Sequence, residues 1–234
     1  MVDSKVEKVL TFFENNHLYV HSTWVEQIFQ KHVFSNNEQL EEQMMYLFLN
    51  TDIKKTLTMR SCLPENIFDQ HNNVLPGPYC LQVIQIQDIG ISLFNQLEYL
   101  EQFDDSGHLK LFNIINDDGA IDYDDDDLAE NNDKCVMKKM IKLLLEDASG
   151  VCVWANEYKP MKDIHLKMSL GSKILLRNVL VLRGVLVLVP ESTTFLGGQV
   201  FELNQGYFPC GLRNQLKQKL YSTTEVSNVQ EISD

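Results

Sequence analysis

Apolar residues recur three or four positions apart in three stretches of the first fifty residues, which is the spacing of amphipathic helices. The first stretch contains Val6, Val9, Leu10 and Phe13. Each stretch follows a Ser or Thr with a Glu three residues later, a pattern that satisfies backbone donors at a helix start and predicts a capping box. The pattern predicts a bundle of three short helices within residues 1–63. The three capping pairs are Ser4 with Glu7, Thr23 with Glu26, and Ser35 with Glu38.

Strand-like runs replace the helical spacing after the Pro-rich segment 75–78. The last of them lies in the stretch 178–189, which reads NVLVLRGVLVLV and is apolar except at its first residue and at Arg183 and Gly184. This stretch is too short, and too charged at its centre, to span a membrane. It predicts two buried strands, or one strand bent at Gly184. Because it lacks polar alternation, we expect one face to be covered by the interior of a sheet or barrel and the other by another element or a partner protein.

The runs predict five strands, with a short turn segment near residues 161–168 between the third and the fourth. The predicted fold is α+β, with an N-terminal three-helix bundle at residues 1–63 followed by a five-stranded OB-fold β-barrel at residues 64–221. A long insertion after strand 1 is expected at about residues 90–135. A helix is expected at residues 213–221, and a flexible tail at 222–234. The five strands are expected at residues 79–89, 137–146, 151–156, 173–182 and 185–189.

The insertion region carries most of the charge. Residues 98–133 contain thirteen acids and one base, a net charge of −12 out of −13 for the whole chain, whereas residues 134–220 contain thirteen bases and six acids. Apolar residues separated by acids favour a segment that docks on a partner protein. The alternative is a disordered acidic insertion. The candidate apolar contact residues are Leu93, Phe94 and Leu97, and further along Leu111, Phe112 and Ile115.

The sequence offers no recognisable catalytic or metal site. Five cysteines are widely spaced without a C-x-x-C pair, which favours a reducing compartment over a zinc site or a disulfide framework. His17 and His21 have i, i+4 spacing but no nearby carboxylate or Cys in the sequence, and the acidic run 122–127 lacks the Gly and Glu of a calcium loop. The sequence contains no nucleophile elbow, Walker loop or dinucleotide-binding motif. We therefore expect a protein that is not an enzyme and uses no cofactor.

Single-stranded nucleic acid binding needs exposed aromatic rings beside basic residues. The predicted barrel supplies bases, and Trp154 and Tyr158 are its main ring candidates. Trp154 alternates with Cys152, so we expect it in the core rather than on the surface. Strong autonomous DNA binding is therefore not expected, and weak, salt-dependent binding through the basic residues stays open. These bases are Lys138, Lys139, Lys142, Lys159, Lys162, Lys167, Lys173, Arg177 and Arg183.

An ordered set of short motifs between about residues 75 and 200 resembles the N-terminal OB domain of the RecQ-mediated genome instability protein 1 family. No single motif is specific, and the resemblance rests on their order. From the N-terminal side they are Pro76-Gly77 before Leu81-Gln82-Val83, Leu145-Glu146-Asp147 followed by Trp154 and Glu157-Tyr158, Gly171-Ser172-Lys173, Leu182-Arg183-Gly184-Val185, Pro190, and Leu196-Gly197-Gly198-Gln199-Val200.

The resemblance implies a non-catalytic nuclear subunit of a complex between a RecQ-family helicase and topoisomerase III. Such a complex acts in homologous recombination and DNA repair by dissolving double Holliday junctions. The insertion after strand 1, here residues 90–135, would reach the topoisomerase gate and modulate its opening. Lys173 matches the family's G-x-K pattern and, with Arg177 and Arg183, is the candidate docking residue. The alternative is that Lys173 is an exposed turn residue and that Arg183 only closes a bulge.

Two other functions stay open from the sequence. The first is a stand-alone OB-fold protein that binds single-stranded DNA without any protein partner. The second is a scaffold that binds the topoisomerase without affecting catalysis. A membrane partner is not expected.

Overall fold

The structure is a computed structural model that describes residues 2–32, 34, 39–103 and 140–230. The chain forms two compact units, which are described in turn. The first unit contains residues 1–88 and 140–205, and the second contains residues 89–139 and 206–234. The N-terminal helices and the barrel therefore belong to the same unit. No helix among the described residues is long and apolar enough to cross a membrane.

The N-terminal part of the first unit consists of α1 (Val2–Asn15), α2 (Ser22–Lys31), α3 (Leu40–Leu49) and the short α4 (Ile53–Thr56). Their apolar faces meet around three aromatic rings. The ring centroid of Phe13 lies 5.5 Å from that of Phe48 and 6.1 Å from that of Trp24. Phe13 and Phe48 are completely buried, so the helical spacing in the sequence does mark the core face of these helices.

The capping boxes predicted for the first two helices are wrong. Ser4 lies inside α1, which already begins at Val2, and Thr23 lies inside α2, which begins at Ser22. His21 occupies the N-cap position of α2 without a side-chain cap. The chain is held extended up to that point because the His21 N–H donates to Thr56 O at 2.9 Å, so tertiary contacts set this helix start. The third predicted pair, Ser35 and Glu38, lies outside the described residues.

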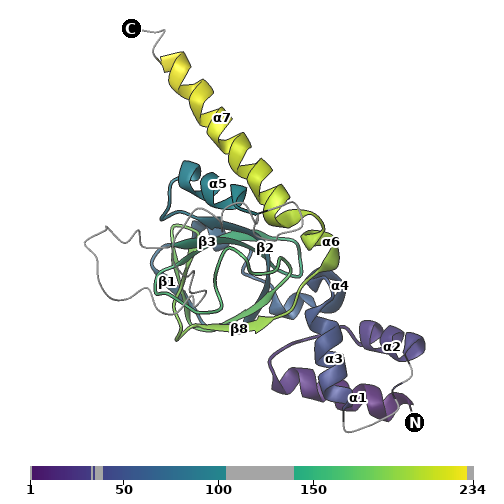
Figure 1. Ribbon diagram of the computed structural model, residues 1–234. Helices are drawn as coiled ribbons and strands as arrows, with labels where there is room; N and C mark the ends of the chain where they lie inside the picture. The colour runs from purple at the N-terminus through teal and green to yellow at the C-terminus, as the bar shows by residue number, and fades with distance from the viewer. Residues whose placement is uncertain (1, 33, 35–38, 104–139, 231–234) are drawn as a thin grey trace, which may run out of the picture. The chain divides into compact units, whose positions relative to one another are not determined.

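The barrel is an eight-stranded sheet with the order β1-β6-β7-β4-β3-β2-β5-β8 (Figure 1). Short connecting helices η1 (Met59–Ser61) and η2 (Ile67–Asp69) precede it, and α6 (Phe201–Asn204) follows it. The strands are β1 (Asn73–Leu75), β2 (Tyr79–Asp88), β3 (Ile141–Glu146), β4 (Cys152–Glu157), β5 (Lys173–Leu176), β6 (Val179–Leu182), β7 (Val185–Leu188) and β8 (Thr193–Gly197).

These eight segments are five long strands, three of which are bent. Segments β1 and β2 form the first long strand, because β1 pairs with β6 and β2 continues along β5. Segments β5 and β6 form the fourth, and β7 and β8 form the fifth, which pairs with the fourth along its length. The parallel pairing of β4 with β7 closes the barrel. The predicted five-stranded OB-fold is therefore confirmed, and the order of strands around the barrel is the one that this fold requires.

Residues with positive φ allow the sharp changes of direction. The first strand bends at Gly77, where φ is +70° and a Cβ atom would lie 2.5 Å from Leu176 O. Arg183 and Gly184 both have positive φ and connect the paired residues Leu182 and Val185. Such a two-residue connection is the geometry of a primed hairpin turn, so the stretch 178–189 is two strands joined by a hairpin.

The long insertion begins after the last residue of β2 and ends before the first residue of β3, and these two residues are paired with each other. Asp88, the last residue of β2, is paired with Ile141, the first residue of β3. The Asp88 carboxylate also accepts a hydrogen bond from the Met140 N–H at 3.3 Å. The insertion after strand 1 is therefore confirmed in position, although β3 begins later than the predicted residue 137. Residues 104–139 lie outside the described part of the chain.

The second unit contains α5 (Leu93–Glu101), the short helical turn η4 (Tyr207–Gly211) and α7 (Leu212–Gln230). Helix α5 packs against α7. The Arg213 guanidinium donates to Leu100 O at 3.1 Å and to Phe103 O at 3.2 Å, which satisfies carbonyl groups at the end of α5. Helix α7 continues to Gln230, so the prediction that the helix ends at residue 221 is corrected.

Candidate functional site

Lys173 does not lie on the surface. The four residues of β5 are all buried, because one face of the strand lines the barrel and the other meets the N-terminal helices. The Lys173 side chain is completely buried, and its Nζ donates to Leu49 O at 3.0 Å and to Gly171 O at 2.7 Å. Leu49 is the last residue of α3. The lysine therefore joins the end of a helix to the barrel wall, and the expectation of an accessible Lys173 is corrected.

Burial also changes the chemistry of the two titratable groups at this point. Burial lowers the pKa of Lys173 to about 8, and the neighbouring Cys80 and Asp52 oppose this shift. Burial raises the pKa of the Cys80 thiol to about 12, and Lys173 opposes that rise. A thiol with such a pKa is an inert core group rather than a nucleophile.

The other candidate docking residues are separated in the structure. Arg177 and Arg183 are both exposed, but they lie at opposite ends of β6. In α5, Leu93 and Leu97 are half-buried and Leu100 is buried, whereas Phe94 is 69% exposed. Phe94 therefore points away from the face that Leu100 occupies, so the three candidate residues of α5 do not all lie on one face. The remaining candidates, Leu111, Phe112 and Ile115, lie outside the described residues.

Trp154 lies on the outer wall of the barrel. Along β4 the residues alternate, with Val153 and Ala155 buried and Trp154 half-exposed. The prediction that Trp154 belongs to the core is therefore wrong. Cys152 points away from the barrel interior, and Trp154 lies on the same face of the strand. Trp154 is therefore outside the core. The apolar pair Val153 and Ala155 was the signal in the sequence that could have given the correct orientation.

We call the surface formed by Lys142, Leu144, Trp154 and Asn156 the β3–β4 face. The Lys142 Nζ lies 4.4 Å from the centroid of the Trp154 ring, within the range of a cation–π contact. Leu144 is paired with Trp154, and Lys142 with Asn156. The Asn156 Oδ1 atom is buried and accepts no hydrogen bond from the described residues. A ring, a cation and an amide on the second and third strands of an OB barrel suit the stacking of a nucleobase.

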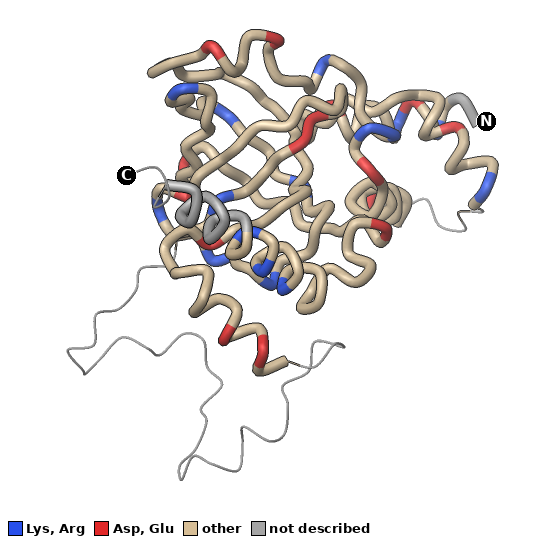
Figure 2. The backbone as a smooth tube through the Cα atoms, turned by 90° about the horizontal axis from the view of Figure 1, so that it is seen from above, with Lys and Arg blue, Asp and Glu red and all other residues tan. Residues whose placement is uncertain are grey.

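The remaining bases do not extend this face into one basic stripe. Lys159 pairs with Glu191 at 2.8 Å, Lys173 is buried, and Lys138 and Lys139 lie outside the described residues. Figure 2 shows basic and acidic positions interspersed along the described chain. Of these bases, Lys159 is paired and Lys173 is buried, so neither adds free charge to the β3–β4 face.

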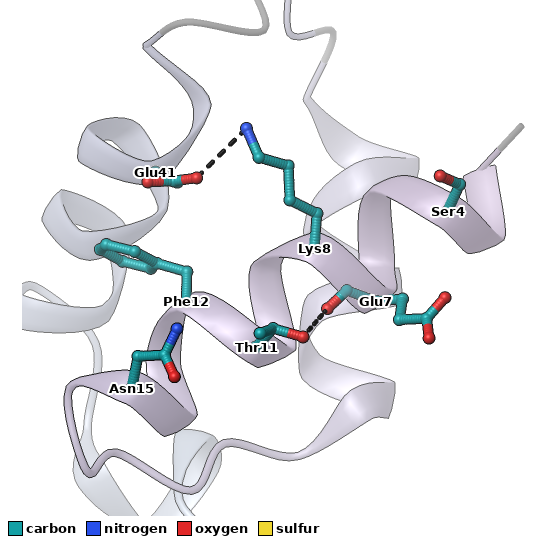
Figure 3. A pocket seen from close by; sticks show the side chains of 7 residues that line it. All are labelled: Ser4, Glu7, Lys8, Thr11, Phe12, Asn15 and Glu41. Atoms are coloured by element: carbon teal, nitrogen blue, oxygen red, sulfur yellow. Dashed lines mark hydrogen bonds and ion pairs between the residues drawn. The ribbon is translucent and has the colours of Figure 1, made fainter.

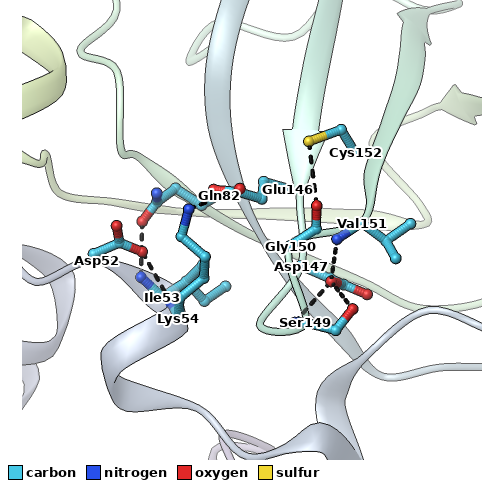
Figure 4. Close-up of polar contacts among 10 residues, drawn as sticks. All are labelled: Asp52, Ile53, Lys54, Gln82, Glu146, Asp147, Ser149, Gly150, Val151 and Cys152. Carbon is cyan, nitrogen blue, oxygen red and sulfur yellow. Dashed lines mark hydrogen bonds and ion pairs between the residues drawn. The ribbon is translucent and has the colours of Figure 1, made fainter.

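Polar contacts fix the connectors between the helices and the barrel (Figure 4). The Lys54 ammonium pairs with Glu146 at 2.9 Å, and this hydrogen bond raises the pKa of Lys54. The Ile53 N–H donates to Gln82 Oε1 at 3.0 Å. The Asp147 carboxylate accepts from the Leu63 N–H at 2.9 Å and from groups of its own turn. Glu146 and Asp147, which belong to the Leu145-Glu146-Asp147 motif, therefore have a structural role.

A groove along α1 is lined by the seven residues drawn in Figure 3 and has a volume of about 430 Å³. Lys8 pairs with Glu41 across it at 3.2 Å, and the Thr11 hydroxyl donates to Glu7 O at 2.9 Å. The groove is thus a polar seam between α1 and α3. Among the described residues, no three His, Cys, Asp or Glu side chains are grouped so that they could hold a metal ion.

Comparison with known proteins agrees with the fold and with the ordered motifs. The family description "RMI1, N-terminal OB-fold domain" matches residues 63–210. The RecQ-mediated genome instability protein 1 of Schizosaccharomyces pombe is 36% identical over 217 residues, which cover 87% of this chain and 92% of that protein. The Arabidopsis thaliana protein of the same name is 30% identical over 165 residues, or 70% of this chain. The Xenopus laevis protein is 26% identical over 195 residues, or 82% of this chain.

The relatives differ in how much of their length this chain covers. It spans nearly all of the S. pombe protein but only 19% of the Arabidopsis protein and 32% of the Xenopus protein. The region that the family description matches coincides with the closed barrel and its connectors. Because the closed barrel, the ordered motifs and the relatives all agree, this chain belongs to the RecQ-mediated genome instability protein 1 family.

Proposed function

We propose that this chain is a nuclear, non-catalytic subunit of a complex between a RecQ-family helicase and topoisomerase III. In this proposal the first unit binds the topoisomerase, and residues 90–135 modulate the opening of its gate. The complex would then decatenate DNA and dissolve double Holliday junctions during homologous recombination. The topoisomerase supplies the chemistry, and this chain uses no cofactor.

The observation that carries the proposal is the place of the insertion. The strand pairing of the barrel stops at Asp88 and resumes at Ile141, so both ends of the intervening segment are joined to one ladder pair. The acidic run of residues 98–133 follows that point and has a net charge of −12. A strongly charged segment anchored on a rigid barrel is suited to act on a basic, DNA-handling partner. Family membership supports the link to a RecQ helicase.

The test is co-purification of the full chain with topoisomerase III, followed by decatenation with and without the chain. The proposal expects a stable complex and faster decatenation. A stable complex with unchanged decatenation would leave a scaffold role instead. Absence of a complex at micromolar concentrations of both proteins would reject the topoisomerase as partner.

A second candidate function is direct binding of single-stranded DNA, and the β3–β4 face favours it. The Trp154 ring with Lys142 above it provides one stacking position of the kind that OB-fold proteins use. The test is fluorescence anisotropy of a labelled oligothymidylate with the full chain alone. Trp154→Ala and Lys142→Glu should each weaken binding by about tenfold, with Arg183→Glu as a control for charge elsewhere on the barrel. Equal weakening by all three variants would point to diffuse charge rather than to this face.

A further inference from the structure

Strand β8 has an open edge. It stands at the end of the strand order, and β5 is the strand that pairs with it among the described residues. The preceding segment β7 still pairs with β4, but that pairing ends at Leu188. Beyond this point the chain turns through Pro190, and the connector residues Pro160, Met161 and Ile164 lie across a cavity from β8.

The edge carries neither a charged residue nor a proline, the two side-chain features that usually protect open strands. Natural sheets block such edges with charged residues, prolines or a covering element. The sequence of β8 is TTFLG, which contains neither a charge nor a proline. Since an antiparallel strand directs alternate N–H and C=O groups to each side, half of these groups face away from β5.

Two cavities lie on the two faces of this edge. One has a volume of about 310 Å³ and is lined by Thr193 and Phe195 of β8, together with the connector residues Pro160, Met161 and Ile164. The other has a volume of about 430 Å³ and is lined by Thr194 and Leu196 of β8, with residues from the end of α1, from α3 and from the bend after β5. Successive residues of β8 thus point into different cavities, as strand geometry requires.

We propose that the β8 edge binds an extended peptide segment of a partner protein as an added β-strand. Main-chain hydrogen bonds to β8 would hold the peptide, and its side chains would enter the two cavities alternately. This surface is built on β8 and its two flanking cavities, so the inference stands apart from the gate role proposed for residues 90–135.

The linings of the two cavities specify the peptide. The smaller cavity is lined by Met161, Ile164 and Phe195, and its two charged residues, Lys162 and Asp163, are exposed and opposite in sign, so alternate peptide residues should be apolar. The Thr193 Oγ1 atom beside it is buried and makes no hydrogen bond among the described residues, which leaves one polar position for a ligand.

The larger cavity contains His17 and the exposed Arg177. Its acid, Glu191, pairs with Lys159 at 2.8 Å, and this contact lowers the pKa of Glu191. The Arg177 guanidinium forms no ion pair within the described part of the chain. The remaining peptide residues should therefore be acidic, and the expected ligand alternates apolar and acidic residues.

The experiment measures the binding of synthetic ten-residue peptides to the full chain by isothermal titration calorimetry. One series alternates Val or Phe with Glu, a second alternates the same apolar residues with Lys, and a third carries the Glu series with N-methyl groups on alternate amides. The Glu series should bind, and N-methylation should weaken it by at least about tenfold because it removes main-chain donors on one edge. Arg177→Glu should weaken the Glu series by at least about tenfold and favour the Lys series, whereas Arg183→Glu, a matched charge reversal away from β8, should leave binding unchanged.

Several outcomes would overturn the proposal. Failure of every series to bind a folded wild-type chain at millimolar peptide would remove it. Equal binding of N-methylated and unmodified peptides would exclude strand addition. Equal losses in Arg177→Glu and Arg183→Glu would reduce the effect to nonspecific charge. A wild-type dimer that peptide dissociates would make a second copy of the chain, rather than a partner peptide, the natural occupant of the edge.

Discussion

The Lys173 ammonium group is buried against two carbonyl oxygens and not against a carboxylate. A carboxylate in its place would meet the same two acceptors and would have no donor. We predict that Lys173→Glu lowers the free energy of unfolding by at least about 3 kcal/mol, the usual cost of an uncompensated buried charge. Urea denaturation checks this value. Arg183→Glu, an exposed control, should stay within about 0.5 kcal/mol of wild type. A Lys173→Glu protein as stable as that control would contradict the burial described here.

The lowered pKa of Lys173 predicts a specific dependence of stability on pH. The folded state has a pKa of about 8 and the unfolded state about 10.5. Below pH 8 both states bind the proton, so the cost of burying the charge is fully present. As pH rises from 8 towards 10.5, only the unfolded state keeps the proton, and the cost is relieved.

The free energy of unfolding of the wild type should therefore rise, relative to that of Lys173→Met, as the pH passes through this window. A pKa difference is worth about 1.4 kcal/mol per unit, so the rise is at most about 3 kcal/mol. Urea denaturation of both proteins at pH 7.5 and at pH 10 measures the difference, in which other titrating groups cancel. If wild type and Lys173→Met differ in stability by the same amount at both pH values, Lys173 has the same pKa in the folded and unfolded states, and the prediction is wrong.

The side-chain environment of Lys173 could not be read from the sequence, whereas that of Trp154 could have been. Lys173 is buried because helices from the first fifty residues cover β5, and no local pattern contains that contact. Alternation with Cys152 predicts Trp154 in the core, but the apolar pair Val153 and Ala155 is the one that lies inside. The burial of Lys173 depends on which face of β5 is covered, and that is decided by helices far away in the chain.

The end of α3 and the loop after β8 approach closely. In Gly198 φ is +87°, and a Cβ atom would lie 2.3 Å from Leu49 O. In Gly150 φ is +90°, but a Cβ atom would have nothing within 4 Å. We predict that Gly150→Ala costs about 1 kcal/mol from backbone strain alone, and that Gly198→Ala costs about 2 to 4 kcal/mol because the clash is added. Chemical denaturation of the two variants separates the contributions, and equal costs would mean that the loop can move away from α3.

The contacts between α3, α4 and the barrel predict that the helices and the barrel unfold together. The two tryptophans of the chain report on each part, with Trp24 among the helices and Trp154 on the barrel. Trp154→Phe and Trp24→Phe give single-tryptophan proteins, and their fluorescence transitions in urea should have the same midpoint. Midpoints that differ by more than the stability effect of each substitution would mean that the helices form an independent domain.

The elements themselves were largely predictable. Long apolar runs predicted strands because a strand that is covered on both faces keeps an uninterrupted apolar sequence. The segments β1 and β8 were missed because each is short and follows a turn. The capping pairs failed because contacts such as the bond from His21 to Thr56 decide where a helix starts.

The whole chain should tolerate the loss of residues 104–139. Replacing them with a Gly/Ser linker of half the length keeps the Asp88–Ile141 pair and changes the closure entropy by only about 0.6 kcal/mol. We predict cooperative unfolding with a nearly unchanged midpoint, retained topoisomerase binding and lost stimulation of decatenation. Thermal denaturation, co-purification and the decatenation assay measure these three quantities. Loss of cooperative unfolding would place part of the segment in the core, and full stimulation would remove the gate role.

Charge and length placed the acidic segment, and the family resemblance supplied its suggested partner. Neither could show which surfaces of the folded chain are available, because Arg177 and Arg183 look alike in the sequence but lie at opposite ends of β6. Only the three-dimensional arrangement distinguishes a base beside a cavity from a base at a hairpin tip.

The insertion starts and ends at a single ladder pair of the barrel. This pair is therefore a natural graft point. A foreign segment of any composition could be exchanged there without altering the register of the surrounding strands, since Asp88 and Ile141 already face each other. Family members could therefore diverge in this segment while the barrel sequence stays under its own packing constraints. Chimeras that carry the corresponding segment of the Arabidopsis or Xenopus protein on this barrel would reveal whether partner choice is inherited from the segment or from the barrel.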